Sequence, residues 1–470
     1  MTNTRLTLLA AVFAASPALA QQPVARVASA VRADTTLPAD SIPVAKKADS
    51  TFVVLKVPRL PRYEAPPVEI AHIRAPDQRG VNVYESPKEE TVPFTGFKLI
   101  WGGAFTQQFQ NLTHSNTASP KMVGTVDANS LIQIGSGFNN ADANLFMNVQ
   151  VAKGIRVAVE TYASARHHQE TWVKDGYFLI DGSPIESALL DNIMKYVTLK
   201  VGHFEVNYGD THFRRSDNGQ TIYNPFVGNY IIDAFNTEIG AEAYLRSNGY
   251  MAMAGITGGE VHGQVTAPGM RGPTYLFKLG MDKQLADTRF RLTGSMYKTD
   301  RSVNNTLTSG DRAGSRYYDV LENTASTETA NAWSGAIQSG MRNMVTAFVL
   351  NPSVIYGNAE FYGNVETITG AAGTELNRRT LRQLVGEGLY RFWDKKLYVG
   401  GRYNTVNGEL ANMPADINVQ RSQIGGGWYV TPNVLSKIEF VNQRYNNYPT
   451  TDLRNGGKFQ GFMVEGAVAF

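Results

Sequence analysis

The last ten residues of the chain, GFMVEGAVAF, form the sequence feature that most restricts its fold. Successive side chains of an extended strand point to opposite faces, so every second residue shares a face. One face consists of Phe462, Val464, Gly466, Val468 and Phe470. A soluble domain seldom ends on a strand with an exposed aromatic residue, because its open edge would pair with other chains. In a closed barrel the last strand pairs with the first, so this C-terminal strand favours a barrel.

From Phe94 onward, segments of about ten residues repeat in which apolar and polar side chains alternate. We count sixteen such segments. They lie near 95–111, 143–152, 155–165, 171–180, 197–208, 235–246, 249–258, 273–285, 288–299, 333–349, 352–367, 380–392, 396–406, 418–430, 434–445 and 458–470. This alternation predicts an all-β fold with sixteen strands.

The connections between these segments alternate between short and long. Short turns, in which Gly, Asn and Pro supply the geometry, lie near 152–154, 247–249, 285–288, 351–352, 393–396 and 431–433. Long polar connections lie near 112–142, 209–234, 259–272, 300–332, 368–379, 407–417 and 446–457. The connection at 166–170 is brief, and residues 187–194 are expected to form a short helix. Since this pattern is typical of outer-membrane barrels, we predict a closed antiparallel 16-stranded transmembrane β-barrel over residues 94–470.

Charged side chains share one face of the predicted strands. Arg289 and Arg291 alternate with Phe290 and Leu292, and an Arg or Lys facing lipid would cost about 2 to 4 kcal/mol at the bilayer midplane. We therefore expect charged residues to line an aqueous channel. The basic set is Lys98, Arg156, Lys200, Arg246, Lys278, Arg289, Arg291, Arg391, Arg402, Arg421 and Lys437. The acidic set is Glu160, Glu238, Glu242, Asp282, Glu360, Glu387, Glu439 and Glu465. Most of these charges are expected to pair across strands.

The long connection at 209–234 combines charged residues with four aromatic residues. Aromatic side chains need burial, so we expect this loop to fold into the barrel and narrow the pore. The predicted constriction consists of His212, Arg214, Arg215, Asp210 and Asp217. Adjacent cations suggest a modest preference for anions, whereas the acids suggest a transverse field with little net selectivity. An ordinary external loop is the alternative.

The N-terminal part of the chain has a different composition. Residues 1–20 contain an apolar run after Arg5 and a small-residue cleavage pattern at residues 18–20, as in a secretory signal peptide. Residues 21–93 hold 10 of the 20 prolines and have little periodicity, which predicts a disordered periplasmic linker. A tail that reaches toward the cell wall or enters the barrel as a plug is the alternative.

Composition and motifs argue against several other classes of protein. The chain has no Cys, so it has neither disulfides nor thiolate metal sites. Basic residues are dispersed, which argues against nucleic acid as a partner. Without a catalytic or phosphate-binding motif we expect no enzyme, no cofactor and no metal site. An outer-membrane hydrolase, or a surface receptor or adhesion barrel favoured by the long 300–332 loop, are the alternatives.

One stretch resembles a known family. The strand VTLKVGHFEVNYG (197–209), the Arg-containing loop and NTEIGAEAYL (236–245) are similar to the corresponding stretch of the phosphate-selective porin superfamily. The terminal Phe470 also resembles the signal by which bacterial outer-membrane proteins are recognised for insertion. The resemblance implies a general porin of the outer membrane, commonly a homotrimer, through which small hydrophilic solutes diffuse. The chain departs from that family in its Pro-rich extension, which lacks heptads, and in a lumen that is not strongly basic.

Overall fold

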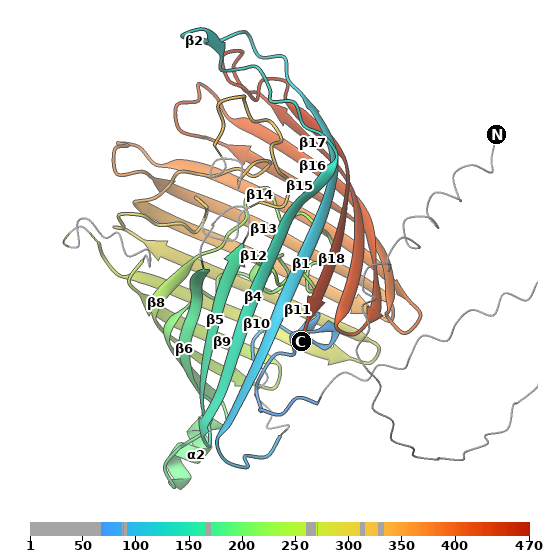
Figure 1. Cartoon of the computed structure of the whole chain (residues 1–470). Helices are drawn as coiled ribbons and strands as arrows, with labels where there is room; N and C mark the ends of the chain where they lie inside the picture. The colour runs from blue at the N-terminus through green and yellow to red at the C-terminus, as the bar shows by residue number, and fades with distance from the viewer. Residues whose placement is uncertain are drawn as a thin grey trace, which may run out of the picture. The chain divides into compact units, whose positions relative to one another are not determined.

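The chain forms a closed β-barrel, as a computed structural model shows (Figure 1). The structure describes residues 67–86, 88, 92–164, 171–259, 269, 271–310, 315–327 and 333–470. The predicted signal peptide (1–20), the first part of the predicted linker (21–66) and the whole of the brief connection at 166–170 lie outside the described residues. Of the predicted linker, the structure describes residues 67–86, 88, 92 and 93.

The barrel strands follow one another in antiparallel order around a closed ring. They are β1 (Lys98–Ser115), β4 (Gly137–Ala152), β5 (Ile155–Ser164), β6 (Thr171–Ile180), β7 (Val197–Glu205), β8 (Thr237–Ser247), β9 (Tyr250–Thr257), β10 (Thr274–Leu285), β11 (Thr288–Thr299), β12 (Met344–Tyr356), β13 (Ala359–Ala371), β14 (Arg379–Phe392), β15 (Leu397–Gly408), β16 (Ile417–Thr431), β17 (Val434–Asn446) and β18 (Lys458–Ala469). A small hairpin, β2 (Met122–Val123) and β3 (Val126–Asp127), lies in the loop after β1. The predicted all-β class and sixteen-stranded barrel are confirmed.

The ring closes between the first and last strands. β18 pairs with β1 over twelve residues, from Ser115 opposite Lys458 to Ala104 opposite Ala469. The last residue continues this ladder, because Phe470 and Gly103 exchange two backbone hydrogen bonds of 2.9 Å. Phe470 is exposed on the outer face and Glu465 is fully buried on the inner face, as the C-terminal alternation predicts.

The bounds expected for two strands, 333–349 and 352–367, were wrong, and so was the turn expected between them at Asn351 and Pro352. β12 continues through Pro352 to Tyr356, and the turn follows it. Proline lacks an amide hydrogen, and the register of β12 with β13 skips Asn351 and Pro352. The Asn351 side chain instead donates to the Gly363 carbonyl oxygen at 3.2 Å. Glycine is required there, since a Cβ on Gly363 would lie 2.9 Å from Pro352 Cγ.

The residues just before β12 belong to the long loop, residues 300–343, and pack inside the barrel. Ile337 N donates to Ile231 O at 2.8 Å, and Met341 is fully buried. Apolar residues that alternate in a loop packed within the lumen have the same sequence pattern as a strand. This explains why the tenth strand was expected about ten residues too early.

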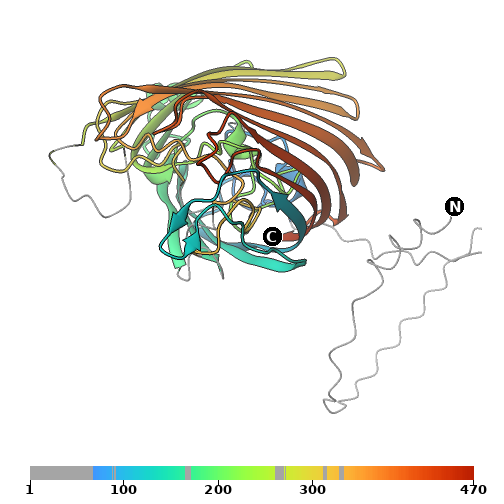
Figure 2. The ribbon, with the colours of Figure 1, turned by 90° about the horizontal axis from the view of Figure 1, so that it is seen from above.

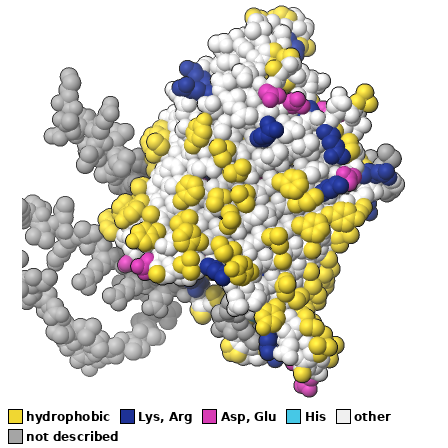
Figure 3. Space-filling model, turned by 180° about the vertical axis from the view of Figure 1, so that it is seen from behind, with side chains coloured by type: hydrophobic (Ala, Val, Ile, Leu, Met, Phe, Trp, Pro, Cys, Tyr) yellow, Lys and Arg dark blue, Asp and Glu magenta, His cyan; other side chains and the backbone are white. Residues whose placement is uncertain are grey.

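The outer face of the barrel is largely apolar (Figure 3). Exposed apolar residues on the strands include Leu99, Trp101, Phe105, Leu145, Val201, Phe290, Leu292, Phe348, Leu350, Leu384, Val399, Ile424 and Phe440. Their neighbours face inward: Leu292 is 43% exposed, whereas Arg291 is 6% exposed. An exterior with this many exposed apolar side chains suits lipid.

A short helix interrupts the connection between β6 and β7. α2 (Ala188–Met194) begins after Ser187, whose side chain accepts a hydrogen bond from Leu190 N at 3.5 Å. The N-cap therefore satisfies one of the free amides of the first turn. The predicted helix at 187–194 is confirmed, and no helix in the described ranges is long and apolar enough to cross a membrane.

Candidate channel lumen

The third loop, residues 206–236 between β7 and β8, lies inside the ring of strands (Figure 2). Side chains of the wall hold its backbone: Asn404 Oδ1 accepts from Ile231 N at 2.7 Å and Gln383 Oε1 accepts from Ile232 N at 2.9 Å. Phe226 and Tyr230 are buried. The loop therefore has the inward fold expected from its aromatic residues. Polar side chains of the wall accept the hydrogen bonds that its buried backbone amides would otherwise make with water.

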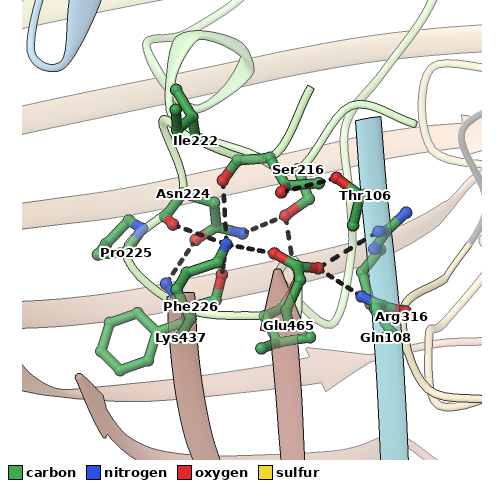
Figure 4. A network of polar contacts seen from close by, with 12 residues as sticks. Thr106, Gln108, Ser216, Ile222, Asn224, Pro225, Phe226, Arg316, Lys437 and Glu465 are labelled. Atoms are coloured by element: carbon green, nitrogen blue, oxygen red, sulfur yellow. Dashed lines mark hydrogen bonds and ion pairs between the residues drawn. The ribbon is translucent and has the colours of Figure 1, made fainter. Parts of the chain in front are cut away.

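A polar network holds the third loop against β1, β17 and β18 (Figure 4). Lys437 Nζ donates to the carbonyl oxygens of Thr221, Asn224 and Phe226 at 3.0 to 3.1 Å. The same ammonium group pairs with Glu465 at 2.5 Å. Because its donors are used on the loop and one carboxylate, this wall cation fixes the loop instead of facing open water.

Glu465 also connects the long loop to the wall. Arg316 of the long loop pairs with Glu465 at 3.3 Å and with Asp142 at 2.9 Å. All three side chains are fully buried. Two loops, the third and the long one, therefore share a carboxylate of the C-terminal strand.

Arg214 is buried and pairs with the wall. Its guanidinium contacts Glu387 at 2.5 Å, and Arg402 pairs with the same carboxylate at 2.8 Å. Arg214 also donates to Asn82 Oδ1 and lies over the Tyr362 ring, 4.7 Å from its centroid. The charge of this predicted constriction residue is therefore partly balanced, by a carboxylate that it shares with Arg402.

Arg215 has two acidic partners within its own loop, Asp217 at 3.1 Å and Asp233. Asp217 in turn pairs with Lys174 and accepts a hydrogen bond from Tyr162. Burial alone would raise the pKa of Asp217, but the charges of Lys174 and Arg215 lower it further than burial raises it. Asp217 therefore remains an anion that cancels part of the positive field of Arg215.

Asp210 lies between two wall cations. Its carboxylate contacts Lys278 at 2.8 Å and Arg291 at 2.7 Å. Burial raises its pKa, whereas Lys278 and Arg291 lower it, and the result lies below the usual value. This acid is ionised at neutral pH and neutralises wall charge.

His212 does not contribute a positive charge. Its Nε2 lies 3.0 Å from Asn207 Oδ1, and its ring packs against Phe213 at a centroid distance of 3.7 Å. Burial, helped by the charges of Lys278 and Lys200, lowers its pKa well below the usual value. At neutral pH the expected cations of the constriction reduce to Arg214 and Arg215.

The predicted wall residues face the interior, and most of them have partners. Arg156 pairs with Asp181 at 2.6 Å, and Arg289 pairs with Asp282 at 2.6 Å. Further wall contacts are Glu160 with Lys174, Lys200 with Glu242, Arg246 with Ser86 O, Arg291 with Asp210, Arg421 with Gly335 O and Lys98 with Glu69 O. The expected pairing across strands is present, also for Arg391 with Glu360, Arg402 with Glu387 and Lys437 with Glu465. Loops and the N-terminal segment supply the partners of the other basic wall residues.

Sequence reasoning missed Lys174, which sits among four carboxylates. It contacts Asp217, and it lies 3.2 Å from Glu205, 3.6 Å from Glu160 and 3.8 Å from Asp175. The register of β5 with β6 skips Lys174, so a bulge turns both Lys174 and its neighbour Asp175 inward. Two consecutive charged residues inside an alternating segment were the available signal.

The inner segment, residues 67–86, packs against the barrel and the third loop. Ile70, Ala71 and Tyr84 are buried. The predicted disordered linker is therefore wrong for these described residues, which pack as in the alternative of a tail that enters the barrel. Tyr84 packs edge-on against Phe213 at 5.8 Å, and Glu85 pairs with Lys278 at 3.0 Å.

A cavity of about 510 Å³ remains between the inner segment, the third loop and the wall. Its lining includes Arg74, Glu160, Lys174, Glu205 and Tyr223. The cavity lies beside both the Lys174 cluster and the inner segment, so its lining combines charged and apolar side chains around a space in which water or a small solute fits.

No family model matches the chain, and no curated protein matches it. An anion-selective porin from Comamonas acidovorans is a similar solved structure, with 11% identity and a TM-score of 0.49, covering 80% of this chain and 100% of that one. OprB of Pseudomonas putida has 7% identity and a TM-score of 0.46, covering 80% and 94%. The channel DcaP of Acinetobacter baumannii has 9% identity and a TM-score of 0.44, covering 80% and 98%.

Proposed function

We propose that the chain is an outer-membrane channel through which small hydrophilic solutes diffuse passively, without catalysis or a cofactor. One observation carries the proposal: a closed sixteen-stranded barrel is apolar on its outer face and lined by charged groups within. A barrel of this size has a lumen wider than wall side chains can fill. Polar lining groups lower the barrier for hydrophilic solutes, which move along their gradient.

The proposal places the barrel in the bacterial outer membrane and the N-terminal extension in the periplasm. It is supported by the signal-peptide pattern of residues 1–20 and by the short turns at the end of the barrel where β1 begins and β18 ends. Lipid is the proposed partner of the apolar exterior. A homotrimer is proposed from the sequence resemblance alone.

Charge selectivity is proposed to be weak and to favour anions. The basic residues of the third loop and wall support the sign of this preference. The ion pairs of Arg214 with Glu387 and of Arg215 with Asp217 support its small size, because paired charges cancel at a distance.

The test is electrical recording from the purified full chain in planar bilayers, beside a variant that lacks residues 67–86. The proposal expects ion current and, in a salt gradient, a reversal potential of small magnitude on the anionic side. Stable insertion of both proteins without any current would refute the channel and favour a receptor or adhesion barrel.

A further inference from the structure

The inner segment crosses the mouth of the barrel at the end with the short turns. Near its start, the carbonyl oxygen of Glu69 accepts from Lys98 of β1 at 3.0 Å. Near its end, Glu85 pairs with Arg291 of β11 at 2.9 Å. In the closed strand order β1 and β11 lie on opposite sides of the ring. A chain held at two opposite points of a ring spans the opening between them.

Further contacts hold the middle of the segment to the rim. Gln78 N donates to Pro432 O at 2.9 Å, and the Gln78 side chain donates to Lys395 O at 2.9 Å. Both acceptors lie in short turns, between β16 and β17 and between β14 and β15. On the other side of the segment, the Asn82 side chain donates to Glu360 of β13 at 3.1 Å. These contacts are polar and distributed around the rim.

The segment also closes against the third loop. Arg74 donates to Phe213 O at 2.8 Å and lies 3.6 Å from the centroid of the Tyr223 ring. Tyr223 donates to Ala75 O at 2.5 Å, and Asn82 Oδ1 accepts from Arg214. A solute that passes the predicted constriction therefore meets the inner segment next.

The attachment has the features of a contact that can be released. Across the described residues 67–86 the only regular element is the single turn η1 (Gln78–Gly80), and the segment pairs with no barrel strand. Its strongest anchor, Glu85, shares Lys278 and Arg291 with Asp210 of the third loop. If Glu85 left, both cations would keep a carboxylate partner. Release of Glu85 therefore leaves neither Lys278 nor Arg291 without a counter-charge.

We propose that residues 67–86 act as a plug that closes the inner mouth of the barrel reversibly, and that the channel conducts when this plug withdraws. The inference rests on the proposed channel function. The cavity of about 510 Å³ beside the plug, lined by both charged and apolar side chains, gives it space into which to move.

The first test compares conductance in planar bilayers for four proteins: the wild type, a deletion of residues 67–86, Glu85→Gln and Glu69→Gln. Deletion of residues 67–86 is expected to raise the mean conductance at least about fivefold, because a lumen of this size admits ions once its mouth is clear. Glu85→Gln removes the anchor charge and is expected to increase the fraction of time spent open. Glu69→Gln is the matched control, since Glu69 holds the barrel through its backbone carbonyl.

The second test locks the plug in place. The chain has no Cys, so Asn82→Cys with Glu360→Cys introduces the two thiols that a cleavable bifunctional reagent can bridge. Crosslinking is expected to abolish the current and cleavage to restore it, while either single variant is unaffected by the reagent. This test stands even if the deletion variant fails to fold.

The outcomes separate the two proposals. Equal current from the wild type and the deletion variant, or full current through the crosslinked protein, would overturn the plug and leave the channel intact. No current from any of these proteins would overturn the channel and the plug together.

Discussion

The wall of the barrel and the contents of its lumen are held in place by different physics. On β11 every second residue faces out, and an apolar or a charged side chain is enough to decide which way a residue faces. Phe290 and Leu292 face the apolar exterior, and Arg289 and Arg291 face inward. Inside, residue type is insufficient, because Arg214 is held by one particular carboxylate on β14. The exterior therefore tolerates any apolar side chain, whereas the lumen requires specific partners.

The largest effect is expected from removing a shared partner inside the lumen. Glu387→Ala leaves the buried Arg214 and Arg402 without their common carboxylate, which is expected to lower the free energy of unfolding by about 3 to 5 kcal/mol. Urea unfolding in detergent, followed by tryptophan fluorescence, measures the change. Leu384→Ala, on the outer face of the same strand, is the control and should cost about 2 kcal/mol or less, the transfer free energy of its lost methyl and methylene groups. Equal losses would contradict the contrast between lumen and exterior.

A charge on the outer face is expected to cost somewhat less. Leu292→Arg places a guanidinium against lipid near the middle of β11 and should lower the free energy of unfolding from bilayers by about 2 to 4 kcal/mol. Leu292→Gln is the uncharged control and should cost less. If Leu292→Arg were neutral, β11 would not present this face to lipid.

A smaller effect is expected on selectivity. Arg214→Ala with Arg215→Ala removes two cations but frees their acidic partners, so the anion-to-cation permeability ratio should fall by about twofold or less. Reversal potentials in a salt gradient measure the ratio, with Lys298→Ala at the outer end of β11 as the control. A cation-selective wild type, or no change in either conductance or selectivity, would place the constriction elsewhere.

The smallest effect is expected from pH between about 7 and 5. Burial raises the pKa of Glu85, but Lys278 and Arg291 lower it well below the usual value for a carboxyl group. Because the pKa of Glu85 is lower when the plug is attached, the ionised carboxylate stabilises the attachment at every pH above about 4.3, the ordinary pKa of a glutamate. This stabilisation is lost only as the pH falls toward the lowered pKa. The pKa of Asp210 is lowered as well, so Asp210 stays ionised, and the pKa of His212 is lowered, so His212 stays neutral.

Conductance should therefore stay constant between about pH 7 and pH 5 and rise only in stronger acid, where the plug loosens. Glu85→Gln should show no such rise. A transition near pH 6 in the wild type would mean that another group controls the mouth.

The sequence predicted the wall far better than the lumen. Alternation is a local property, so the faces of β11 and β18 could be predicted residue by residue. The prediction from alternation failed at Pro352, where the Asn351 side chain and the absence of a Cβ at Gly363 let a proline remain within the strand. The inward fold of the third loop could be expected from its aromatic residues.

The partners within the lumen could not be predicted, because they are distant in sequence. Arg316 and Asp142 are brought together only by the closed ring, and Lys174 turns inward only through a bulge. The plug appeared only as an alternative to a disordered linker, for a similar reason. Its prolines and weak periodicity indicate a chain without a core of its own, and its apolar residues are buried by the barrel instead.

The ladder between Phe470 and Gly103 has a consequence for how the protein is made. The partner of β1 is β18, so β1 keeps an unpaired edge until β18 has been made and exported. Cells must therefore keep the nascent chain from aggregating for the whole time of its synthesis and export. A chain cut before β18 would leave the edges of both β1 and β17 unpaired and free to pair with other chains, so it would aggregate instead of forming a narrower pore.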